Sequence, residues 1–200
     1  MHGTIFEKRL AGAFKKALQS GTVAISTLAT GSQTKDRYGR EPVLILTRNE
    51  VVQLYLLRAG LTRFVGFAGM AGEAVRASFL EAEEEARSTE AGLWKDPRYS
   101  VYSAETAPER DGFAIVEGKP IGTAHTRSMV YLNFGEDWRT DFTAAIEPGL
   151  LKTDAWAGWD IDALVGRKLR LRGWMRPYNG AFMTLTGPDQ IEILTSGPAD

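Results

Sequence analysis

The spacing of the apolar residues changes once along this 200-residue chain. In the first half they recur every three to four residues, which predicts amphipathic helices at residues 4–20, 51–59 and 73–90. Beyond residue 112 they alternate with polar residues, as they do along half-buried strands. The stretch between the two patterns, residues 103–112, is rich in Ala, Glu, Pro and Asp and is typical of a linker. The sequence therefore predicts two domains, 1–102 and 113–196, and an α+β fold overall.

A charged stretch, Lys-Asp-Arg-Tyr-Gly-Arg, occupies residues 35–40 of the predicted first domain. It lies between predicted strands at 22–27 and 42–46, and its Asp and Gly favour a tight turn. Such a turn would hold Arg40 at the base of a strand, where a guanidinium group can bind a phosphate through two parallel hydrogen bonds. Taken alone, a short motif of this kind is more often an ordinary solvated turn.

The order of these elements over residues 6–94, with Thr-Lys-Asp-Arg-Tyr-Gly-Arg at 34–40 and Gly-Leu-Trp at 92–94, resembles the later part of the staphylococcal-nuclease-like (thermonuclease) family. The resemblance implies a partial OB-type barrel with helices, and action on nucleic acid phosphodiesters. In that family the arginine of the Tyr-Gly-Arg turn contacts the scissile phosphate. The resemblance thus implies a catalytic role for Arg40 and substrate-binding roles for Lys35, Arg37 and Tyr38.

The same family begins with three strands that this chain does not match. Those strands carry a Gly-Asp-Thr motif, a second arginine and an Asp-Ala-Pro-Glu or Asp-Thr-Pro-Glu motif, which supply the calcium-binding carboxylates and the general base. None of these motifs occurs in the sequence. We expect either a chain cut short at its N-terminus or a natural variant without the catalytic half. In both cases we expect no metal site, no catalytic competence in these residues alone, and calcium only if upstream strands are present.

The predicted second domain is a small all-β barrel of five or six strands. Its segments Tyr-Leu-Asn-Phe-Gly at 131–135, Leu-Arg-Leu-Arg-Gly-Trp at 169–174 and Pro-Asp-Gln-Ile-Glu-Ile-Leu at 188–194 resemble the OB-like domain appended to some bacterial thermonuclease-family proteins. The predicted strands are 113–118, 130–134, 142–146, 168–176, 181–186 and 190–194.

One face of the strand at 168–176 carries Arg170, Arg172 and Trp174. Guanidinium groups can contact phosphates and an indole can stack on bases, so this face is a candidate platform for a single strand of nucleic acid. The alternative is a barrel exterior that its charges keep soluble.

The charge distribution points to an anionic partner for the first domain. The net charge is −1, but residues 1–69 hold 10 Lys and Arg against 4 Asp and Glu, a balance of +6. No apolar run is long enough for a membrane helix, and residues 1–20 do not form a signal peptide. The compartment is left unknown, and an extracytoplasmic location fits if the true N-terminus lies upstream.

Three functions are compatible with the sequence. The first is a truncated phosphodiester-cleaving nuclease, the second a non-catalytic nucleic-acid binder, and the third a protein-interaction module. An incomplete barrel leaves the edges of its remaining strands unpaired, so we also expect self-association through those edges.

Overall fold

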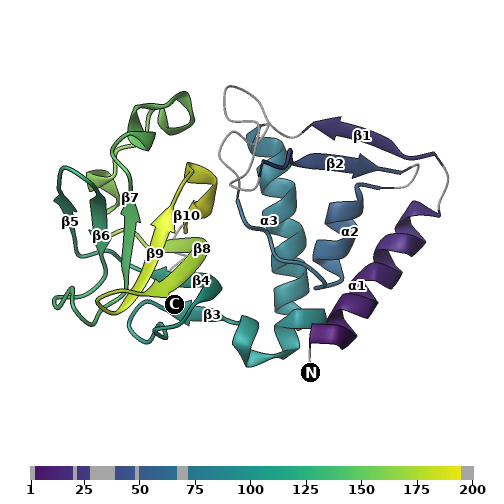
Figure 1. Cartoon of the computed structure of the whole chain (residues 1–200), viewed down its shortest axis with the longest axis horizontal. Coiled ribbons are helices and arrows are strands. Elements are labelled where there is room, and N and C mark those ends of the chain that lie inside the picture. Colours follow the sequence, from purple (N-terminus) through teal and green to yellow (C-terminus); the bar gives the residue numbers. More distant parts are fainter. Residues whose placement is uncertain (1–2, 20–21, 28–38, 48–49, 67–71, 195–200) are drawn as a thin grey trace, which may run out of the picture. The chain divides into compact units, whose positions relative to one another are not determined.

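The computed structural model describes residues 3–19, 22–27, 39–47, 50–66 and 72–194, and the chain divides into two compact units (Figure 1). The first unit comprises Met1–Phe64 and Gly69–Ser100, and the second comprises Val65–Ala68 and Val101–Asp200. Helices and a curled half-barrel sheet are both present, which confirms the predicted α+β class.

The first unit combines three α-helices with an antiparallel pair of strands (Figure 1). The helices lie close to the positions that the apolar spacing predicts. Two lysines, Lys15 and Lys16, occupy the last turn of the first helix, where positive charge interacts favourably with the helix dipole. The elements are α1 (Gly3–Leu18), β1 (Ala24–Thr27), β2 (Val43–Leu46), α2 (Val52–Arg58), α3 (Glu73–Ser88) and the short 3₁₀ helices η1 (Gly92–Lys95) and η2 (Pro97–Tyr99).

A small apolar core holds the first unit together. Leu57 of α2, Phe79 and Ala82 of α3, and Phe64 are buried against one another. The rings of Phe64 and Phe79 lie 5.7 Å apart between centroids. The buried carboxylate of Glu83 accepts a hydrogen bond from the backbone N–H of Phe64 at 2.7 Å. This bond fixes the segment after α2 to α3, because a buried N–H group needs an acceptor.

The two edges of the β1–β2 sheet differ. The side chain of Gln53 on α2 accepts from the N–H of Ile45 at 3.1 Å and donates to the carbonyl of Val43 at 2.7 Å. It therefore covers the edge of β2 as a neighbouring strand would. Strand β1 pairs only with β2 among the described residues, and its Ile25 is 70% exposed. The expected self-association stays a prediction, and the edge of β1 is where a second chain would pair.

Two glycines allow the backbone after α2 to pack directly against the backbone at the start of η1. We call this contact the glycine crossing. Gly60 and Gly92 have φ angles of +63° and +54°, in the left-handed region that glycine adopts most easily. The N–H of Leu93 donates to the carbonyl of Gly60 at 2.8 Å. A Cβ atom on Gly60 would lie 2.1 Å from the carbonyl oxygen of Ala91, and one on Gly92 would lie 2.3 Å from that of Gly60. Both positions therefore require glycine.

The second unit is an eight-stranded curled sheet (Figure 1). The strand order is β3-β4-β8-β9-β7-β6-β5, and β10 also pairs with β8. The pairs β3–β4 and β7–β9 are parallel and the others are antiparallel. The strands are β3 (Val101–Ser103), β4 (Gly112–Gly118), β5 (Gly122–His125), β6 (Val130–Asn133), β7 (Thr143–Ile146), β8 (Leu169–Pro177), β9 (Ala181–Leu185) and β10 (Ile191–Ile193).

The core of the second unit is formed by the inward-facing residues of this sheet. Leu169 and Leu171 of β8, with Met183 of β9, have no measurable exposure. The connection from β7 to β8 contains the 3₁₀ helices η3 (Leu150–Lys152), η4 (Asp154–Trp156) and η5 (Asp162–Leu164). This connection packs on the barrel through Trp156, which is 2% exposed and stacks edge-on against Trp159.

A polar clamp holds β5, the strand at one end of the sheet order. The carboxylate of Asp162 on η5 accepts from Thr123 Oγ1 at 2.5 Å and lies 2.9 Å from His125 Nε2. Sequence reasoning misses β5 because its residues, Gly-Thr-Ala-His, show no apolar alternation. The hydrogen bond from Thr123 and then that from His125 lower the pKa of Asp162 below its usual 3.8.

The glycine crossing predicts a steric penalty that a matched variant can isolate. Gly60→Ala should destabilise the chain by about 3 kcal/mol or more, because the new Cβ adds a backbone clash to the strain of a left-handed residue. Gly39→Ala is the control, since Gly39 has a similar φ of +76° but nothing within 4 Å of its Cβ position. It should cost only about 1–2 kcal/mol. Equal losses in the two variants, measured by urea unfolding, would contradict the crossing.

The clamp predicts an acid-sensitive contribution to stability. Because the pKa of Asp162 is lowered in the folded chain, its contribution is present above the usual value of 3.8 and disappears as the pH falls through the folded value. Asp162→Asn should therefore weaken the dependence of the melting temperature on pH between about 5 and 3. Asp154→Asn, at an exposed position of η4, is the control. An Asp162→Asn profile that parallels the wild type would show that the clamp does not act.

Candidate nucleic-acid interface

The predicted phosphate-binding turn of the first unit is described only at its end. Lys35, Arg37 and Tyr38 lie outside the described residues. Gly39 has a φ of +76°, as a tight turn with glycine requires, and Arg40 follows it just before β2 with an exposed side chain. The structure thus places Arg40 at the base of a strand, and its contact with a phosphate stays a prediction.

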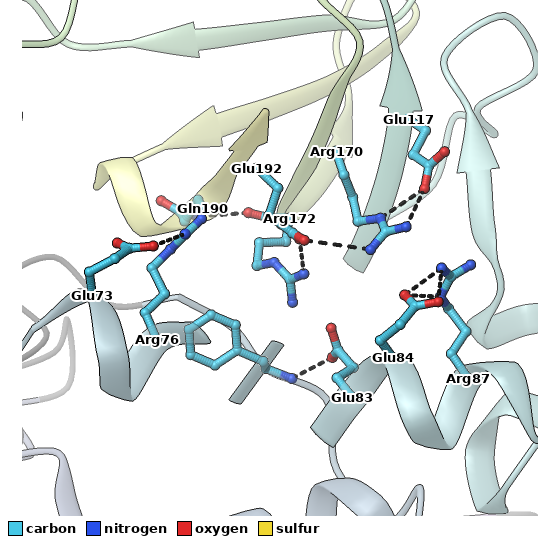
Figure 2. A network of polar contacts seen from close by, with 11 residues as sticks. Glu73, Arg76, Glu83, Glu84, Arg87, Glu117, Arg170, Arg172, Gln190 and Glu192 are labelled. Carbon is cyan, nitrogen blue, oxygen red and sulfur yellow. Dashed lines mark hydrogen bonds and ion pairs between the residues drawn. The ribbon is translucent and has the colours of Figure 1, made fainter. Parts of the chain in front are cut away.

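Arg170 and Arg172, predicted to bind phosphates, both form ion pairs within the second unit (Figure 2). The Arg170 side chain lies 2.8 Å from Glu117 Oε1 and 3.5 Å from Glu192 Oε2. Arg172 Nη2 contacts Glu192 Oε1. Glu117, Arg170 and Glu192 are direct register partners on β4, β8 and β10, where opposite charges attract most closely. A phosphate would have to displace these carboxylates, so binding by this pair stays a prediction.

Trp174, the third predicted residue of that strand, is placed differently. Its side chain is 53% exposed, and Phe113, its register partner on β4, holds the indole edge-on at 6.3 Å between centroids. Two residues further along β8, the guanidinium of Arg176 lies 5.2 Å from the ring centre of Tyr178 and 5.0 Å from that of Phe182. The C-terminal end of β8, which is remote from Glu192, therefore combines aromatic rings with the cation of Arg176.

Cross-strand register extends this surface over five strands. Gly122 of β5 is opposite Asn133 of β6, which is opposite Thr143 of β7; Thr143 is opposite Phe182 of β9, and Phe182 is opposite Arg176 of β8. Directly opposite residues point to the same side of a sheet, and so do residues two positions apart on one strand. We call this side of the sheet the aromatic face. Its aromatic members are Tyr131, Trp174, Phe182 and, on β4, Phe113, which is directly opposite Trp174.

A pocket of about 370 Å³ opens on the aromatic face. Trp138, from the loop between β6 and β7, and Tyr178, from the hairpin between β8 and β9, line it and are each about half exposed. The guanidinium of Arg139 lies 4.7 Å from the ring centre of Trp138, which makes a second cation–aromatic pair beside the pocket. The full lining is Ala124, Thr126, Tyr131, Asn133, Trp138, Thr143, Tyr178, Asn179 and Phe182.

Sequence reasoning missed this pocket, although part of its signal is local. Trp138-Arg139 and Arg176-Pro-Tyr178 each place an arginine beside an aromatic residue in or next to a turn. The turn between β8 and β9 has positive φ angles at Asn179 and Gly180, and the N–H of Tyr178 donates to the carbonyl of Gly180. Only the pairing of β7 with β9 brings these two segments together. An apolar lining with a few convergent polar groups is typical of a ligand site.

The described residues contain no group of three or more His, Cys, Asp or Glu side chains that could hold a metal ion. The calcium that we expect only together with upstream strands stays a prediction. None of the helices in the described part of the chain has the length and apolar character needed to cross a membrane.

Comparison with known proteins places the first unit in a family. Residues 7–96 match the family model described as staphylococcal nuclease homologue, a stretch that runs from α1 to η1 and includes Arg40. No curated protein matches the chain significantly. The match confirms the resemblance read from the sequence, and the curled sheet of the second unit is OB-like. The match therefore shows a staphylococcal-nuclease-like domain at residues 7–96, within the first unit.

Proposed function

We propose that this chain binds single-stranded nucleic acid on the aromatic face of its second unit. The observation that carries the proposal is the pairing of guanidinium groups with exposed rings around the pocket, Arg139 with Trp138 and Arg176 with Tyr178. Exposed rings stack on bases and guanidinium groups contact phosphates, which is the combination that single-strand-binding proteins use. A duplex keeps its bases stacked inside, so a surface of this kind favours single strands.

The nuclease-like first unit supports the same partner. Arg40 stands at the base of β2 with an exposed side chain, in a segment whose sequence carries a balance of +6 over residues 1–69. We propose that Arg40 contacts the phosphate backbone, together with Lys35, Arg37 and Tyr38. Backbone contacts carry no base specificity, so this part of the chain would bind DNA and RNA alike.

We further propose that these residues bind nucleic acid without cutting it. Cleavage in the manner of this family needs a cation, a carboxylate that orients or deprotonates water, and arginines that stabilise the transition state. Arg40 can supply only the last part. Catalytic groups act as a unit, so one arginine without its partners leaves little rate.

A second candidate function is a protein-interaction module, and it differs in its dependence on salt. Binding through phosphates releases counterions and weakens steeply as salt rises. A protein–protein module has no such dependence on an oligonucleotide. The affinity for labelled oligothymidylate, measured at several salt concentrations, therefore distinguishes the two functions.

The proposed binding surface predicts a specific role for Arg176. Arg176→Ala should weaken binding of oligothymidylate and reduce the slope of log affinity against log salt by about 0.7, the value of one lost phosphate contact on a single strand. Arg167→Ala removes the same charge from an exposed position between η5 and β8 and is the control. Fluorescence anisotropy across a salt series measures the affinity and the salt slope of both variants.

If the two variants lose affinity equally, net charge rather than the aromatic face carries the binding. If a neutral oligosaccharide binds as tightly as the oligonucleotide, the proposed ligand is wrong.

The proposal of binding without cleavage predicts an inert chain in a nuclease assay. Purified residues 1–200 with calcium should release no acid-soluble nucleotides from single-stranded DNA or RNA above background, because the carboxylates that the reaction needs are missing. Arg40→Ala is the control for contamination, since a contaminating nuclease would be insensitive to it. Calcium-dependent cleavage that survives repurification and disappears in Arg40→Ala would overturn this part of the proposal.

A further inference from the structure

Thr143 lines the floor of the aromatic pocket and has an unusual environment. It is the central residue of the cross-strand row, between Asn133 and Phe182, and it is 5% exposed. Its hydroxyl oxygen is buried and has no hydrogen-bond partner among the described residues. Thr126, the other threonine of the lining, has a satisfied hydroxyl, which donates to the carbonyl of Met129 at 2.8 Å and accepts from its N–H at 3.0 Å.

An unpaired buried hydroxyl lowers the stability of the protein without ligand. The hydroxyl has lost its hydrogen bonds to water and gained none from the protein, whereas valine would fill the same space without a polar atom. Individual groups of this kind call for an explanation, and a bound ligand that supplies the missing partner is one. The pocket beside Thr143 provides room for such a ligand.

The hydroxyl can reach the pocket by a change of rotamer. The two γ substituents of threonine are a methyl and a hydroxyl of similar size, and a turn of about 120° about χ1 moves the hydroxyl into the place of the methyl and the methyl into that of the hydrogen. Because Thr143 contributes to the lining, a rotamer that points its hydroxyl at the pocket presents that group to an occupant without moving the strand. The hydroxyl can then donate or accept a hydrogen bond.

We propose that the pocket holds one unstacked nucleobase and that the Thr143 hydroxyl bonds to the polar edge of that base. This inference rests on the single-strand binding proposed above. The half-buried ring of Tyr131 provides a surface for a planar base, Phe182, at 3% exposure, adds apolar lining, and the side-chain amide of Asn133 provides a further polar contact. A phosphate does not suit this mainly apolar lining, because the lining contains no Lys or Arg, and Arg139 and Arg176 lie beside the pocket, where they can contact the backbone of the strand. A purely apolar ligand would leave the hydroxyl unpaired.

The test replaces the hydroxyl and the base edge separately. The variant is Thr143→Val, and the control is Thr184→Val, the same change at a residue on the same face of β9 that does not line the pocket. The ligands are short oligothymidylate and the same oligomer built with difluorotoluene, which has the shape of thymine but hydrogen-bonds poorly. Anisotropy gives the two affinities of each protein, one for each oligomer, and circular dichroism gives the melting temperatures.

We expect Thr143→Val to lower the affinity for oligothymidylate by about tenfold, or about 1.4 kcal/mol, and to leave that for the isostere unchanged. We also expect its melting temperature to be no lower than that of the wild type, because an unpaired buried hydroxyl is lost. Thr184→Val should bind both oligomers as the wild type does.

Three outcomes would count against the inference, and they are distinguishable. If the wild type binds oligothymidylate and Thr143→Val binds it equally well, the base-reading role is wrong while the proposed function stands. A Thr143→Val variant that loses affinity for both oligomers equally, or that melts at a lower temperature, would show a structural role for the hydroxyl. Failure of the wild type to bind any oligonucleotide would remove the proposed function, and this inference with it.

Discussion

Strand β8 is the element on which the second unit depends, because it pairs with β4, β9 and β10. Its inward residues, among them Leu169 and Leu171, are fully buried in the core. Each outward side chain of β8 lies beside the side chain of its register partner on β4, β9 or β10. The backbone ladder therefore sets both the packing of the barrel and the surroundings of every outward side chain of β8.

The arginines of β8 show how those surroundings separate residues of one type. Arg170 has a glutamate opposite it on each side, Glu117 on β4 and Glu192 on β10. Arg176 has Phe182 opposite it and lies over aromatic rings. Ion pairs of the first kind tie three strands together, whereas a guanidinium over exposed rings can turn to an anionic ligand. The outward face of β8 therefore has two different ends. The end with Arg170 holds neighbouring strands together, and the end with Arg176 is a candidate binding surface.

The first unit combines an apolar cluster with polar contacts. Among the described residues that cluster holds Leu57, Phe64, Phe79 and Ala82, and the sheet has two strands. Specific polar contacts supplement that core. Gln53 covers the edge of β2, Glu83 binds the N–H of Phe64, and the contact between Gly60 and Leu93 joins the end of α2 to η1. These contacts all lie within residues 7–96, the stretch that matches the family model.

The sequence by itself determined the three helices, most of the strands and the family of the first unit. These properties depend on residues a few positions apart: apolar spacing defines a helix or strand face, and the Tyr-Gly-Arg turn with Gly-Leu-Trp carries the family resemblance. The tertiary structure decided which arginines of β8 have carboxylate partners, and it assembled the pocket. Glu117 and Glu192 are far from Arg170 in sequence, and Thr143 reaches Phe182 only through the parallel pairing of β7 with β9. Such partners are set by strand order and register, which result from the closure of the whole sheet and leave no periodic signal in any one segment.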